Sequence, residues 1–259
     1  MVFLLRTRLQ LGALLCCLLL GACATRPTAD PLAAAIGASA WALASDAGQI
    51  SRVSPGLRPG WVHLKLPGKQ VNQFTPVVED SRIAMWVQSD TSASLLRQQV
   101  HVAADEVGSV KFSWKVPHLI AQADMALRNT DDSPVRIVLA FEGDRSSFSD
   151  KNAMLSELSH TLTGEPLPYA TLMYVWCNTR APGSVIVNPR TDRIRKIVVE
   201  SGAKNLNQWL DYDRNIRADF EKAFGEPPGA LVGIGIMTDT DNTRSMVKAW
   251  YGPMRLAGQ

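Results

Sequence analysis

The sequence predicts a mainly β fold, a β-sandwich with one or two inserted helices. Apolar and polar residues alternate with a period of two in many short segments after residue 57, which places one side of each segment on a core. Turn-forming stretches at residues 67–68 and 181–183 separate such segments. Only two segments repeat their apolar residues at helical spacing, so the helices are additions to a β-structure.

Residues 1–22 have the features of a secretory signal peptide. Two arginines precede an apolar run over residues 11–24, which is shorter than the ~20 residues that a membrane span needs. The run ends in the letters LGAC, which resemble the lipobox of bacterial lipoproteins. The resemblance implies that Cys23 carries the lipid, and that Ala24 after it directs the protein to the outer membrane, on the periplasmic face.

Residues 23–56 are rich in Ala, Ser, Gly and Pro and hold few large apolar side chains. Asp30 and Pro31 are suited to begin a short helix, as its cap and its first turn. We expect this stretch to be a flexible tether between the lipid anchor and a folded domain at residues 57–257.

The strands of that domain follow in order. In the first, Val62 and Leu64 alternate with Trp61 and His63, so the latter two are predicted on the polar face. The segment at 232–237 predicts in the same way that Val232 faces the core. Similar alternation marks residues 110–116 and 135–142, and further strands are expected at 82–88, 94–102, 169–177, 184–188, 193–200 and 246–256.

Two helices interrupt the strands. Asp150 is expected to cap a helix over residues 151–162, which Gly164 ends. The second helix is predicted from apolar residues near helical spacing between Leu206 and Phe224, with Gly225 at its end.

Charge and cysteine usage exclude some classes of function. The net charge is only +3 and no long basic tract occurs, which argues against a nucleic-acid partner. Cys16 and Cys17 leave with the signal peptide, and Cys177 lies in an apolar run, so it is predicted to be a buried, inert thiol. Neither a Gly-x-Ser-x-Gly motif nor a His-Glu-x-x-His motif is present.

Four stretches carry a resemblance to a known family. They are LRPGWVHLK at 57–65, FSWKV at 112–116, DDSPVRIVLAF at 131–141 and FGEPPGALVGIGIMTDTDNTRSMVKAWY at 224–251. Their order resembles that of DUF3047, an uncharacterised bacterial family, over residues 57–257. The resemblance implies a jelly-roll-like antiparallel β-sandwich, similar to galactose-binding-like and carbohydrate-binding modules, and it implies no established activity.

Aromatic residues are the first candidates for a binding site. Trp61 and His63 share the polar face of the first strand, where a ring beside hydrogen-bonding groups is suited to stack on a sugar. Trp86 and Trp250 lie opposite the apolar sets of their own strands and are further surface candidates. The alternative is that Trp61 packs under the tether or against a helix.

Acidic residues are the second candidates. Asp131 and Asp132 are candidate ligand-binding carboxylates, or they cap a turn or pair with Arg128 or Arg136. Asp239 and Asp241 form a weak candidate calcium site, but the loop alone offers too few ligands, so a turn with buried hydrogen bonds is the favoured explanation. No other cofactor is predicted.

Three functions remain open at this point. The first is a non-enzymatic envelope lipoprotein whose sandwich recognises a glycan or another envelope component. The second is a structural or assembly lipoprotein that binds another protein. The third is an envelope polysaccharide hydrolase with paired carboxylates, which the absence of a catalytic motif disfavours.

Overall fold

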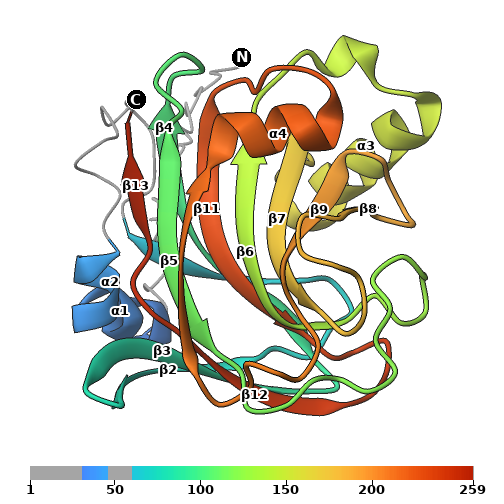
Figure 1. Ribbon diagram of the computed structural model, residues 1–259. Helices are drawn as coiled ribbons and strands as arrows, with labels where there is room; N and C mark the ends of the chain where they lie inside the picture. The colour runs from blue at the N-terminus through green and yellow to red at the C-terminus, as the bar shows by residue number, and fades with distance from the viewer. Residues whose placement is uncertain (1–30, 46–59, 259) are drawn as a thin grey trace, which may run out of the picture.

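The computed structural model describes residues 31–45 and 60–258, which form two β-sheets with helices around them (Figure 1). The seven-stranded sheet has the order β1 (Trp61–Lys65), β4 (Ala93–Val102), β11 (Leu231–Asp239), β6 (Ser133–Phe141), β7 (Ala170–Cys177), β9 (Ile194–Ser201) and β8 (Val185–Val187). The six-stranded sheet has the order β10 (Trp209–Asn215), β5 (Ser109–Lys115), β12 (Met246–Tyr251), β3 (Arg82–Asp90) and β2 (Gln73–Glu79), and β13 (Arg255–Ala257) pairs with β5.

The strand order is that of a jelly roll. The strands β3, β12, β5 and β10 are neighbours in one sheet, and β4, β11, β6 and β7 are neighbours in the other. The chain alternates between the two sheets from β3 to β6 and again from β9 to β12, as in a jelly roll, whereas β6 to β9 all lie in the seven-stranded sheet. The expected mainly β jelly-roll-like sandwich is confirmed, with one difference: β7 and β9 pair in parallel.

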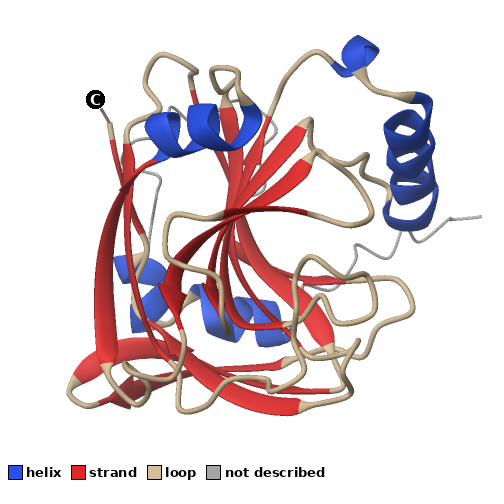
Figure 2. Ribbon diagram, turned by 45° about the vertical axis from the view of Figure 1, so that its right-hand side comes forward, coloured by secondary structure: helices blue, strands red, loops and turns tan. Residues whose placement is uncertain are grey.

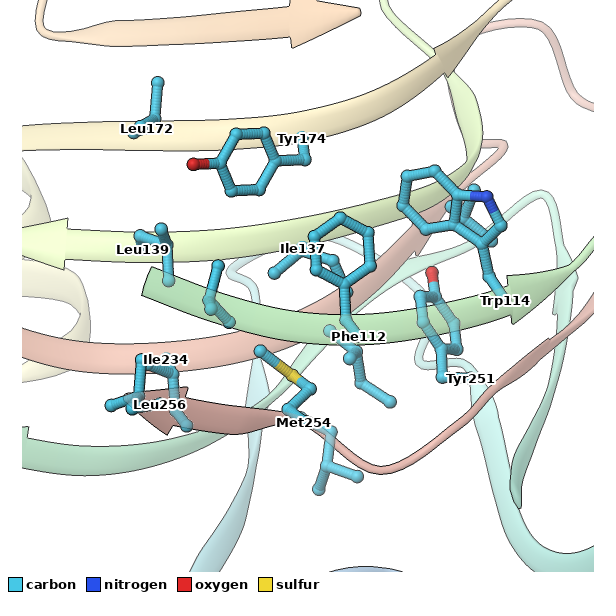
Figure 3. Packing of buried hydrophobic residues seen from close by; sticks show 14 of the residues in the cluster. Phe112, Trp114, Ile137, Leu139, Leu172, Tyr174, Ile234, Tyr251, Met254 and Leu256 are labelled. Atoms are coloured by element: carbon cyan, nitrogen blue, oxygen red, sulfur yellow. The ribbon is translucent and has the colours of Figure 1, made fainter. Parts of the chain in front are cut away.

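The core lies between the two sheets. Phe112 and Trp114 of β5 point towards Tyr174 of β7, and the rings of Phe112 and Tyr174 stack with centroids 5.6 Å apart (Figure 3). Their side chains are almost completely buried, so this contact joins the sheets through large apolar area. Cys177 is also buried and free, as the sequence predicted.

The tether prediction is wrong for residues 31–45. These residues form α1 (Pro31–Gly37) and α2 (Ala40–Ala44), which pack on the sandwich. Trp41 is fully buried, with its ring centroid 4.7 Å from that of Trp61. The stretch has few large apolar residues, but Ile36 and Trp41 both enter the core. The expected short helix at Pro31 is present; Cys23 and the rest of the predicted signal peptide and tether lie outside the described residues.

The helices after the first strands agree with prediction only in part. The helix α3 (Asp150–Thr163) is present, although Ser149 rather than Asp150 caps it, and Gly164 ends it with φ of 76°. The second predicted helix is wrong for its first part, because residues 209–215 form the strand β10. Only its second part is helical, as α4 (Ile216–Phe224), which begins after Asn215. A short 3-10 helix, η2 (Arg145–Ser147), precedes α3.

The polar face of α3 is turned towards the body of the protein. Asn152 and Ser156 are buried, while Met154, Leu158 and Leu162 are exposed. Figure 2 shows α3 beside the sheets and outside the sandwich core. None of the helices in the described ranges is long and apolar enough to cross a membrane.

Candidate functional site

Three tryptophans lie in one row across the outer face of the six-stranded sheet. The register pairs Trp86 of β3 with Trp250 of β12, Trp250 with Lys115 of β5, and Lys115 with Trp209 of β10. Thr75 of β2 pairs with Trp86 and completes the row. All of these side chains are partly exposed. We call these five residues the tryptophan row.

Strand geometry explains why the row faces outwards. Side chains of a strand alternate between faces, and the neighbours Met85, Trp114 and Tyr251 are fully buried in the core. Adjacent strands lie ~4.8 Å apart, so Trp86 and Trp250 are next to each other and Trp209 lies about 10 Å beyond Trp250. The row therefore offers a strip of aromatic rings roughly 14 Å long, perpendicular to the strands.

Charged side chains accompany the rings. The ammonium group of Lys115 lies 5.3 Å from the ring centroid of Trp250, and it donates to Glu79 at 2.6 Å and to Asp80 at 2.8 Å. Hydrogen bonds to Asp80 and then to Glu79 raise the pKa of Lys115. Lys248 lies 6.0 Å from the Trp86 centroid. The row thus combines aromatic surface with groups that donate and accept hydrogen bonds.

A cavity of about 650 Å³ lies beside the row. Arg82 connects the two features, because its guanidinium group lies 5.3 Å from the Trp209 ring, donates to Asp211 at 2.8 Å and also lines the cavity. Further lining residues are Lys111, Tyr212, Asp213 and Arg255.

The course of the chain after β12 explains the cavity. The pairing of β12 with β3 stops at Tyr251 and Met85, so the first residues of β3 have no β12 neighbour on that side. Gly252 then passes close to β5: a Cβ atom there would lie 2.0 Å from the Ser113 Oγ atom. The strand β13 continues along β5 from Arg255, and the space between it and the start of β3 stays open.

Trp61 and His63 do not lie on a solvent-exposed face, and that prediction is wrong. Trp61 is 3% exposed and packs on Trp41 of α2. His63 is buried against the edge of Phe74, and its Nε2 atom lies 2.8 Å from Ser94 Oγ. The first strand runs beneath the N-terminal helices, so its polar-looking side faces protein rather than water. The alternative that Trp61 packs against a helix is confirmed.

Asp131 and Asp132 are buried and form no exposed surface for a glycan. Asp131 binds Lys196 at 2.6 Å and Arg136 at 3.2 Å, so the expected pairing with Arg136 is present. Burial, followed by the charge of Arg136, lowers the pKa of Lys196 to about 8. Asp132 accepts hydrogen bonds from Asn242 and Thr243 and fixes the loop before β12. Their roles in the described structure are those of internal partners.

Asp239 and Asp241 converge with Asp132. One carboxylate oxygen of each lies within 4.8 Å of the others. Asp239 also faces Arg136 at 3.2 Å, and burial raises the pKa of Asp239 well above its usual range. This acidic cluster lies at the end of β11, in a segment separate from the tryptophan row.

Sequence patterns identified Trp86 and Trp250 but missed Trp209, Lys115 and Arg82. Trp209 lies within the segment from Leu206 to Phe224 that the sequence predicts as a helix, which hid its place in the row. Its strand does show a signal, because Leu210 and Tyr212 alternate with acidic residues at 211 and 213. Lys115 alternates with buried residues of a correctly predicted strand, so its outward direction was predictable and only its neighbours were not.

Comparison with known proteins gives a family and a set of similar structures. The family described as "Protein of unknown function (DUF3047)" matches residues 59–255. No curated protein matches the chain.

Similar solved structures include a family 11 carbohydrate-binding module from Clostridium thermocellum in complex with a β-1,3-1,4-mixed-linked tetrasaccharide. It has 10% identity and a TM-score of 0.36, and the match covers 76% of this chain and 88% of the module. The xyloglucanase domain of NopAA, a type three effector from Sinorhizobium fredii, in complex with cellobiose has 7% identity and a TM-score of 0.40, covering 77% and 93%. The enzymatically active domain of bacteriophage CBA120 tailspike protein 4 has 12% identity and a TM-score of 0.37, covering 83% and 23%.

Proposed function

This chain belongs to the DUF3047 family, whose description gives no activity, and we propose that its sandwich is a glycan-binding module of a bacterial envelope lipoprotein. The tryptophan row is the observation that carries the proposal. Three indole rings gathered by strand register on one outer face form a platform, whereas isolated surface aromatics do not.

The chemistry of the row suits a sugar chain. A pyranose ring has apolar C–H faces, which favour contact with an indole ring, and hydroxyl groups around its edge, which need hydrogen-bond partners. Trp86, Trp250 and Trp209 supply the first kind of contact. Lys115, Lys248 and the Arg82–Asp211 pair supply the second. The charges nearest the row include both signs, which favours a neutral glycan over a strongly acidic one.

The row and the cavity together give the ligand a direction. Because the row crosses the strands, an extended oligosaccharide would lie across β3, β12, β5 and β10. Arg82 lies beside Trp209 and also lines the cavity, so one end of the bound oligosaccharide would reach that cavity. We propose that the lipid anchor at Cys23 holds this module at the periplasmic face of the outer membrane.

Alanine variants of the row test the proposal. The domain and its Trp86→Ala and Trp250→Ala variants are titrated with neutral cell-surface oligosaccharides of increasing length, found by screening a glycan array. Each variant is expected to weaken binding about tenfold or more, because a central aromatic contact is lost. Trp250→Phe keeps a ring and should retain most of the affinity.

Leu158→Ala on α3 is the matched control, since Leu158 is exposed and lies on a helix outside the sheet. Its affinity should equal that of the wild type. Unchanged affinity in the folded Trp86→Ala and Trp250→Ala variants would refute this site. Failure of the wild type to bind any glycan on the array would refute the function.

A further inference from the structure

The acidic cluster brings together three separate parts of the chain. Asp132 ends the loop before β6, Asp239 is the last residue of β11, and Asp241 lies in the loop before β12. Asp132 and Asp239 are buried and Asp241 is half-buried. One oxygen from each side chain lies within 4.8 Å of the other two, which is the spacing of ligands around one ion.

The hydrogen bonds of the cluster leave one oxygen without a partner. Both oxygens of Asp132 accept bonds from the 242–243 segment, at 2.8 Å from Asn242 Nδ2 and 2.6 Å from Thr243 Oγ1. The Oδ2 atom of Asp239 faces Arg136 at 3.2 Å. In the described part of the chain, no group donates to Asp239 Oδ1, although this residue is only 6% exposed. A buried carboxylate oxygen without a donor is costly, so either a proton or a cation is expected there.

The neighbouring cations do not fill this position. Arg136 is shared between Asp239 and Asp131, and Lys196 is bound to Asp131. Lys69 contacts Asp241 from the solvent side, and its side chain is 35% exposed. Lys69 comes from the turn after β1, so it can move away without disturbing a strand.

We infer that Asp132, Asp239 and Asp241 bind a divalent cation, with Asp239 Oδ1 as the innermost ligand. Oxygen ligands from carboxylates at irregular positions suit calcium, which accepts 6–8 such ligands in flexible geometry, better than magnesium with its strict octahedron. Water supplies the remaining ligands from the side of Asp241, and Lys69 leaves that side when the ion binds. The ion would fix the 240–245 loop to the end of β11.

Calcium titration of the chelator-treated protein tests the site directly. Calorimetry should show one calcium ion per chain, bound more tightly than magnesium, and calcium should raise the melting temperature by a few degrees. Asp241→Asn should weaken calcium binding by about tenfold or more, because a charged ligand is lost. Lys69→Met should strengthen it several-fold, since the competing ammonium group is gone.

Two comparisons distinguish a cation from a proton held on Asp239. Asp213→Asn is the control, because Asp213 is an exposed acid paired with Lys111, and its calcium response should match the wild type. Asp239→Asn should abolish the calcium response. If the wild type shows no calcium binding and Asp239→Asn is as stable as the wild type, the cluster holds a proton and the inference is wrong. Should Asp239→Asn fail to fold, the wild-type titration and Asp241→Asn still decide.

Discussion

Lys196 has no exposed surface, and its neighbours decide how its charge behaves. It lies on the outer side of β9, where its ammonium group bonds to Asp131 at 2.6 Å and to the Met125 carbonyl oxygen at 3.1 Å. Burial disfavours the charged form, and the nearby Arg136 adds repulsion, so the pKa of Lys196 falls from 10.5 to about 8. The unfolded chain therefore holds this proton more tightly than the folded protein does.

The sign of this difference predicts how stability depends on pH. Between about pH 8 and 10, the unfolded chain binds a proton that the folded protein lacks, so the free energy of unfolding should rise with pH. Across the full interval this residue contributes at most roughly 3 kcal/mol. Urea unfolding at several pH values measures it, and Lys196→Met should remove the rise. Above pH 10 Tyr251 lowers the free energy of unfolding as the pH rises. Burial raises its pKa, so the folded protein keeps a proton that the unfolded chain loses. An equal rise in Lys196→Met would contradict this assignment.

At the residue scale, the sequence predicts which side of its strand a residue occupies better than it predicts what packs against that side. Trp86 and Trp250 were predicted to face outwards because their strands alternate regularly. Trp61 obeys the same alternation, but α2 covers its face of β1. Alternation separates two faces of a strand and does not say which of them another element covers. That information lies in contacts between residues distant in sequence.

At the scale of elements, α2 shows how one side chain fixes a whole segment. The helix has only five residues, too few to be stable alone, and Ser39 caps its start. Trp41 is fully buried among core residues and packs on Trp61, while Leu43 is 69% exposed. The attachment of the N-terminal helices to the sandwich therefore depends on Trp41.

We expect Trp41→Ala to lower the free energy of unfolding by about 3–5 kcal/mol, since a large buried ring is removed. Leu43→Ala on the same helix removes an exposed side chain and should change stability by less than about 0.5 kcal/mol. Urea unfolding of both variants provides the measurement. Similar stabilities would show that α2 is not part of the folded unit.

Other elements show where sequence patterns stop being sufficient. The apolar residues from Leu206 to Phe224 fit a helix, yet β10 occupies residues 209–215 because this segment pairs with β5. Val232 was predicted to face the core, but the register of β11 shifts between Leu231 and Gly233. Leu231 is buried instead and Val232 is only partly buried. A bulge of this kind depends on the neighbouring strand and leaves no periodic signal.

At the scale of the whole molecule, the class of fold followed from many short alternating segments with few helices. The jelly-roll order needed more, because it depends on which strands pair across the sheets. The resemblance at residues 224–251 supplied that expectation, and the pairing of β11 with β4 and β6 is consistent with it. The parallel pairing of β7 with β9 was not predicted, since neither strand carries a mark of its partner's direction.

The proposed lipid anchor also concerns the molecule as a whole. When the full chain is expressed in bacteria grown with labelled palmitate, it should incorporate label and fractionate with membranes. Cys23→Ala should lose the label, whereas Cys177→Ala should keep it, because Cys177 is buried in the folded domain. Labelled Cys23→Ala protein would show that the lipid is attached elsewhere.

The ends of the two sheets have a consequence for how copies of this protein meet at high concentration. A free strand edge invites another chain to add a strand, which is how fibrillar aggregates grow. Here β2 contains Pro76, which has no N–H group to offer, and β8 has only three residues. The edge at β1 is in contact with α1, and β10 presents Asp211 and Asp213. At high concentration the protein is thus protected against edge-to-edge aggregation by the same edges that complete its fold.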